Sequence, residues 1–174
     1  MSKRTLPYLL EQAVEKYGNN VLMWEKKGDA YTGVTYRDMR ERICQFAGGL
    51  LSLGVKKGDR IALISEGRTD WVTAELGILY TGAINVPLSV KLEELSELKF
   101  RLAHSGARMV VVSAGQVNKI QQIKKDLPDL EKVILLDETA HYDHDQITLQ
   151  NLLDKGKHYL AGQQATFDAI WQAV

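Results

Sequence analysis

Residues 60–87 read RIALISEGRTDWVTAELGILYTGAINVP and contain one complete strand–helix–strand cycle. The apolar run Arg60–Ile64 predicts a buried strand, the periodicity over Thr69–Thr81 predicts a helix, and Ala83–Pro87 predicts a second strand. Gly82 stands where that helix must end, because glycine tolerates the backbone turn that follows a helix. Two strands joined by a helix lie parallel in one sheet, so this stretch favours an α/β fold.

The residues that follow repeat the cycle. Helices are predicted over Glu93–His104 and Gly115–Leu127, and strands over Arg108–Val112 and Lys132–Leu136. Four strands in alternation with three helices predict a parallel sheet with helices on its faces, over about residues 55–137.

Upstream of this layer, the sequence predicts a helix, a β-hairpin and a second helix. The first helix spans Thr5–Tyr17, and the hairpin segment covers about residues 19–35 with a turn at Lys26–Asp29. Thr35 caps the second helix, which ends at Gly54. The hairpin is therefore an addition in front of the parallel sheet.

The last residues predict helices over about residues 148–174, with a turn at Ala161–Gln164 and a polar loop before them, over Asp137–Gln146. The final helix has an apolar stripe made of Phe167, Ile170, Trp171 and Val174. Such a stripe needs a partner surface, so we expect the Phe167/Trp171 face to pack against the remainder of a longer chain. With no internal repeat or linker, residues 1–174 are expected to form a single α/β unit.

The composition of the chain argues against some classes of function. Lys plus Arg and Asp plus Glu both total 22, so no net charge attracts nucleic acid or an anionic membrane. Hydrophobic residues make up 45% of the chain, but no run approaches the roughly 18 apolar residues of a membrane span. The single cysteine, Cys44, forms no internal disulfide, which favours a reducing cytoplasm.

Two glycine pairs, Gly49 with Gly54 and Gly77 with Gly82, have the spacing of a phosphate-binding loop. Each pair lies at the end of a predicted helix, whereas a phosphate-binding loop leaves a strand and enters a helix. We interpret these glycines as helix stops or packing positions. The polar run His141–Asp145 is interpreted as a solvated loop, and no catalytic, cofactor-binding or metal-binding residue is predicted.

The strongest candidate for substrate contact is the turn after the first parallel strand. Ser65, Glu66, Arg68 and Trp71 follow that strand at its carboxyl end, where open α/β sheets keep their ligand sites. Arg68 is suited to an anion, and Trp71 to the wall of a pocket. The alternative is a helix cap followed by a tryptophan that faces the core.

Several segments of the chain resemble one enzyme superfamily. The run Gly48–Glu66, the run Gly82–Leu88 and the residues His104–Ala107 are similar to the AMP-forming acyl-CoA synthetases, and to their long-chain fatty-acid branch in particular. The resemblance extends from Leu6 to about Leu136. This sequence has Gly67 and Thr69 where members of the family often have asparagine and proline.

The resemblance implies part of the large amino-terminal domain of an enzyme that uses ATP and magnesium to convert a fatty acid to acyl-AMP, and then transfers the acyl group to coenzyme A. The family's phosphate-binding loop and its catalytic lysine are absent from residues 1–174, so we expect this chain alone to be inactive. The resemblance is also compatible with a homodimer, and with peripheral association of a cytoplasmic protein with the inner face of the membrane.

Two other interpretations remain open from the sequence. The chain is either a freestanding α/β binding module or a non-catalytic interaction domain that docks through its final helix. A coding sequence that continues past Val174 would argue against both.

Overall fold

The computed structural model describes residues 4–139 and 143–174. Its elements follow the predicted order closely, with a short extra strand near the end. In chain order they are α1 Leu6–Tyr17, β1 Val21–Lys27, β2 Ala30–Thr35, α2 Tyr36–Ser52, β3 Arg60–Ile64, α3 Thr69–Tyr80, β4 Ile84–Pro87, α4 Leu95–Ser105, β5 Met109–Val112, α5 Ala114–Ile123, the 3₁₀ turn η1 Lys124–Asp126, β6 Lys132–Leu135, β7 Gln146–Thr148 and α6 Leu149–Gln172.

The main sheet has five strands in the order β4-β3-β5-β6-β7, and every neighbouring pair is parallel. The predicted parallel α/β layer is therefore confirmed, but the predicted number of strands is one too small. β7 comprises Gln146–Thr148 and pairs with β6, whereas the sequence predicted a polar loop up to Gln146. All three β7 residues are buried.

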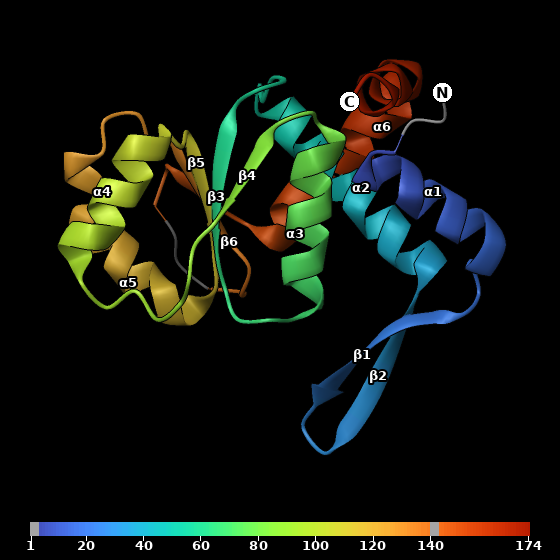
Figure 1. The fold of residues 1–174 in the computed structure, drawn as a ribbon, viewed down its shortest axis with the longest axis horizontal. Coiled ribbons are helices and arrows are strands. Elements are labelled where there is room, and N and C mark those ends of the chain that lie inside the picture. Colours follow the sequence, from blue (N-terminus) through green and yellow to red (C-terminus); the bar gives the residue numbers. More distant parts are fainter. Residues whose placement is uncertain (1–3, 140–142) are drawn as a thin grey trace.

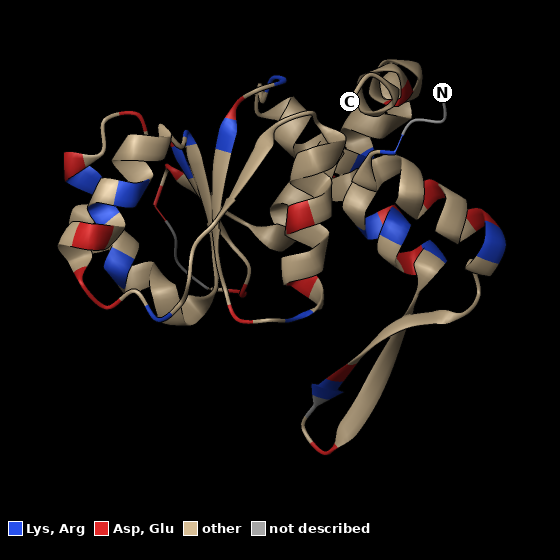
Figure 2. Cartoon of the chain, in the orientation of Figure 1, with Lys and Arg blue, Asp and Glu red and all other residues tan. Residues whose placement is uncertain are grey.

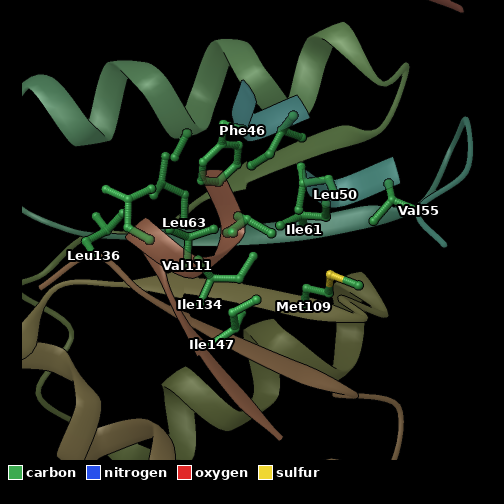
Figure 3. Close-up of a cluster of buried hydrophobic side chains, with 14 of the residues drawn as sticks. Phe46, Leu50, Val55, Ile61, Leu63, Met109, Val111, Ile134, Leu136 and Ile147 are labelled. Carbon is green, nitrogen blue, oxygen red and sulfur yellow. The ribbon is translucent and has the colours of Figure 1, made fainter. Parts of the chain in front are cut away.

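Helices cover both faces of this sheet (Figure 1). Side chains alternate along each strand, so Ile61 and Leu63 of β3 pack with α2, α3 and α6, whereas Ala62 and Ile64 pack with α4 and α5. Figure 3 shows the first of these two cores, where Phe46 of α2 lies over the strands. Because helices cover both faces, the side chains on both faces of the central strands are buried. These strands are therefore nearly unbroken apolar runs.

The hairpin β1–β2 is a separate antiparallel sheet that projects from the body of the protein (Figure 1). Gly28 in its turn has a φ of +62°, a conformation that glycine adopts without strain. Thr35 caps α2 by accepting a hydrogen bond from the Asp38 backbone amide at 3.1 Å, as its position in the sequence predicted.

The end of the chain differs from the prediction. α6 is one helix with a single non-helical residue, Gln163, so the predicted turn over residues 161–164 is only a kink. Phe167 is fully buried, and its ring stacks on Tyr80 of α3 at a centroid distance of 6.3 Å. Trp171 lies 5.9 Å from the same ring. The prediction that this face needs a surface beyond residue 174 is wrong for Phe167, because α3 already covers it.

Glycines bring α2 and α6 into close contact. A Cβ on Gly156 of α6 would overlap the Gln45 carbonyl oxygen and would lie 2.8 Å from the Gly49 nitrogen. Gly54 and Gly82 follow helices with φ values of +84° and +75°. Gly54 and Gly82 therefore end helices, and Gly49 and Gly77 pack against Leu152 and Phe46, as predicted. Within the described part of the chain, no helix has the length and hydropathy needed to cross a bilayer.

Candidate functional site

Polar residues gather at the edge of the sheet where the strands end. Ser65 and Glu66 follow β3, Ser113 follows β5, and Asp137 lies two residues beyond β6. Because these strands are parallel neighbours, their carboxyl ends lie side by side at one edge. This is the edge at which open α/β sheets bind ligands.

Arg68 is the centre of an ion-pair chain at this edge. One terminal nitrogen donates to Asp137 at 2.7 Å, and the other donates to Asp70 at 2.8 Å. Asp70 also accepts from Arg42 of α2 at 2.7 Å. Burial disfavours the charged form of Arg68, but the hydrogen bonds to Asp137 and Asp70 outweigh burial and raise the pKa of its guanidinium. Arg68 thus ties α3 to the segment after β6.

The N-terminus of α3 is capped by a residue from the hairpin. Glu25 accepts a hydrogen bond from the Thr69 backbone amide at 3.1 Å and another from the Thr69 hydroxyl at 3.0 Å. Arg68 occupies the N-cap position, and its side chain makes no capping hydrogen bond. A carboxylate at this position also interacts favourably with the positive end of the helix dipole.

The N-terminus of α5 likewise meets carboxylates. Asp137 accepts from the Ala114 backbone amide at 2.7 Å, and Glu66 accepts from the Gln116 side-chain amide at 3.2 Å. Burial raises the pKa of Asp137, but the hydrogen bonds from Arg68 and Ala114 lower it by more than burial raises it. The pKa of Asp137 therefore lies below its ordinary value. The Ser113 hydroxyl, the Glu66 backbone amide and the Gln116 amide lower the pKa of Glu66. Both groups are thus held as carboxylates.

Ser65, Glu66 and Arg68 therefore lie at one edge of the sheet, but Ser65 is buried there and Trp71 faces the core. Ser65 is buried, and its hydroxyl donates to the Glu66 carbonyl oxygen at 3.0 Å. Trp71 packs against the core on the α2 and α3 side of the sheet. Of the two interpretations of this turn, the helix N-terminus followed by a core-facing tryptophan describes the geometry. A role for these four residues in substrate contact stays a prediction.

A hollow of about 580 Å³ lies between the hairpin, α2 and α3, beside this edge. Its lining includes Glu25, Arg42 and Asp70, and it mixes acidic with basic side chains. Arg42 and Asp70 pair with each other, so part of this charge is already neutralised within the protein.

The residues that the structure describes contain no group of three or more His, Cys, Asp or Glu side chains placed to hold a metal ion. His141 and Tyr142 of the predicted solvated loop lie outside the described residues.

Two residues at this edge, Asp137 and Glu25, were not predicted from the sequence. Asp137 was detectable, because it directly follows a predicted strand at the same edge as Ser65. Glu25 gave a weaker signal: it interrupts the apolar run of β1, but its contact with Thr69 spans 44 positions of sequence.

Comparison with known proteins places the chain in a family. The sequence profile of the AMP-binding enzyme family matches residues 10–166. The chain belongs to the AMP-binding enzyme family. A chloroplastic long-chain-fatty-acid–[acyl-carrier-protein] ligase of Arabidopsis thaliana is 31% identical over 134 residues, which cover 76% of this chain and 18% of that protein. The long-chain-fatty-acid–CoA ligase heimdall of Drosophila melanogaster is 32% identical over 139 residues, covering 76% of this chain and 20% of that protein.

The fold agrees with this membership. The crystal structure of the anthranilate CoA ligase AuaEII in complex with anthranoyl-AMP superposes with a TM-score of 0.76 at 24% identity, covering 85% of this chain and 27% of that one. This AMP-binding family chain spans about a fifth of the length of the two curated relatives.

Proposed function

We propose that the chain is the amino-terminal part of an ATP-dependent, AMP-forming ligase that activates a long-chain fatty acid and transfers it to coenzyme A. The observation that carries the proposal is the family match over residues 10–166, together with two relatives above 30% identity that are both named for long-chain fatty acids. ATP with magnesium supplies the activation chemistry in such a ligase.

The residues of this chain do not themselves fit the phosphates of ATP. A phosphate site at the sheet edge needs a helix N-terminus whose amides and positive dipole are available to an anion. At α3 that position is taken by the Glu25 carboxylate, and at α5 by the Asp137 carboxylate, beside which Glu66 binds the Gln116 side chain. These groups would repel a polyphosphate. We therefore assign the chain a scaffold role, with nucleotide binding by the rest of the protein.

The candidate residues are proposed to contribute to the wall of the substrate channel or of the domain. Arg68 is held on both sides by Asp70 and Asp137, so its role is to fix the turn after β3. Glu66 and Ser65 sit on the same turn, and Trp71 supports it from the core. A fixed turn of this kind positions neighbouring groups without taking part in the reaction.

The coding sequence downstream of Val174 tests the proposal. A continuation into a Ser/Thr/Gly-rich loop that ends in lysine supports it. A stop codon directly after Val174 contradicts it and favours the freestanding binding or interaction module. In a second test, isothermal titration of this chain with ATP and magnesium is expected to give no heat of binding up to millimolar nucleotide, and a saturable isotherm would overturn the scaffold role.

A further inference from the structure

The two ends of the hairpin are held to the body of the protein in different ways. At its base, Leu22, Met23 and Val34 pack against the core cluster that α1, α2, α3 and α6 share. Nearer the turn, over residues 24–32, Glu25 is partly buried, and every other residue whose side chain the structure describes is exposed. We name residues 24–32 the distal hairpin. Its described side chains include no buried apolar group.

Glu25 connects the distal hairpin to α3. The charged residues of the hairpin gather towards its turn (Figure 2), and Glu25 is one of them. Its carboxylate accepts hydrogen bonds from the backbone amide and the hydroxyl of Thr69, at 3.1 and 3.0 Å. Thr69 is the first residue of α3 and is buried, so both bonds form at a buried helix N-terminus. The helix dipole favours a negative charge there, and hydrogen bonds to a carboxylate are stronger than those between neutral groups.

We propose that Glu25 and Thr69 form a latch that docks the distal hairpin on α3, and that the distal hairpin opens as a unit when the latch is released. An isolated two-stranded hairpin is at best marginally stable in water. Segments with few buried apolar contacts open locally, at a lower free-energy cost than global unfolding. Release of the latch should therefore expose the cross-strand hydrogen bonds of the distal hairpin to solvent while the parallel sheet stays folded.

The latch also acts on the hollow between the hairpin, α2 and α3. Glu25 and Thr32 lie opposite each other on the two strands, and both line the hollow. Arg42 and Asp70 line it from α2 and α3. The docked hairpin thus forms one wall of a hollow of about 580 Å³, and the undocked hairpin leaves that side open. The latch makes this wall movable.

Proline at position 69 removes the latch and suits the helix. Proline is favoured at the first position of a helix, because the amide hydrogen that it lacks has no partner within the helix. Arg68 is extended, with a φ of −156° and a ψ of 169°, as suits a residue that precedes proline. Thr69→Pro therefore deletes both donors of the latch, the amide and the hydroxyl. Thr69→Ser keeps both donors and is the matched control.

Hydrogen exchange of the backbone amides, followed by nuclear magnetic resonance, measures the opening on this chain. We expect Thr69→Pro to lower the protection of the distal hairpin by about tenfold or more, as loss of hydrogen bonds to a charged group does. Glu25→Ala should have the same effect, and Thr69→Ser should stay within about threefold of wild type. The double variant Glu25→Ala/Thr69→Pro should lose no more than either single variant, because each removes the same latch.

The urea dependence of exchange tests whether the distal hairpin opens as a separate unit. The sensitivity of an opening to urea grows with the surface that the opening exposes. In the wild-type chain, low urea concentrations should therefore hardly change exchange in the distal hairpin, whereas they should accelerate exchange in β3 and β5.

Three results would overturn the proposal. The first is protection of the distal hairpin within about twofold of wild type in both Thr69→Pro and Glu25→Ala. The second is a double variant whose loss equals the product of the two single losses, because the residues then act independently. The third is a distal hairpin with the same protection and urea dependence as β3 and β5, which would show that it opens only with the whole protein. If Thr69→Pro does not fold, Glu25→Ala and the wild-type urea series decide the first and third of these.

Discussion

Because α2 and α6 are in close contact at Gly156, we expect replacement of this glycine to destabilise the protein. In Gly156→Ala the new Cβ would overlap the Gln45 carbonyl oxygen and lie 2.6 Å from the Gln45 carbonyl carbon. Both obstacles are backbone, so no side chain can rotate away. The helices must separate by on the order of 1 Å, and a gap of that size forfeits a quarter to a half of the dispersion energy of the atoms in contact.

The expected loss follows from two opposed effects. Overpacking costs roughly 1–3 kcal/mol and occasionally more, with this contact at the upper end because backbone meets backbone. Replacing a helical glycine by alanine returns about 1 kcal/mol. We therefore expect Gly156→Ala to lower the free energy of unfolding by about 2–3 kcal/mol, which for a chain of this size lowers Tm by about 5–10 °C.

Urea denaturation followed by far-ultraviolet circular dichroism measures the change. Gly162→Ala is the matched control in the same helix, since a Cβ there meets no atom within 4 Å. It should leave stability unchanged or raise it by up to about 1 kcal/mol. A Gly156→Ala variant within about 0.5 kcal/mol of wild type would refute the close-packed α2–α6 contact.

Three further substitutions and reagents test other parts of the structure. Glu25→Gln should lower the free energy of unfolding by about 1 kcal/mol in urea titrations, because it removes the carboxylate from the N-terminus of α3, whereas Asp29→Asn in the exposed hairpin turn should have no effect. The pKa of Asp137 is lower folded than unfolded, so its stabilisation is complete above its ordinary pKa of 3.8 and is lost as pH falls through the lower folded pKa. Asp137→Asn should therefore destabilise the protein at pH 6 and narrow its difference from wild type towards pH 2, and a difference that stays constant with pH would contradict this. Burial raises the pKa of the Cys44 thiol to about 12, so a disulfide reagent at pH 8 should react with it at least about a hundredfold more slowly in the native protein than in urea, and equal rates would show an exposed thiol.

Much of the fold was predictable because the strands β3, β5 and β6 are buried almost throughout. Met109–Val112, for example, is an apolar run whose four residues are all buried, and periodic helices flank it. β7 was not predictable in this way. It has three residues, two of them polar, and it is a strand because the edge of β6 is available to pair with it. The hydrogen bond between Gln146 and Asp143 further stabilises a strand that local sequence does not favour.

Residues of the candidate site were predictable only where their position follows from the arrangement of strands in the sheet. Asp137 could have been placed at the same edge as Ser65 from the sequence, because both follow predicted parallel strands. The cap that Glu25 provides to Thr69 depends on where the hairpin packs, which no local pattern encodes. Similarly, the apolar stripe containing Phe167 was recognised, but its partner Tyr80 lies on a helix far earlier in the chain.

Fatty-acid-dependent exchange of pyrophosphate into ATP distinguishes a scaffold segment from a catalytic one. It should be measured for this chain and for the complete product of its gene, with a long-chain fatty acid as substrate. We expect exchange by the complete protein and none above the no-enzyme blank by residues 1–174. Exchange by this chain alone would contradict the scaffold role, and a complete protein that is inactive with every long-chain fatty acid would contradict the proposed function.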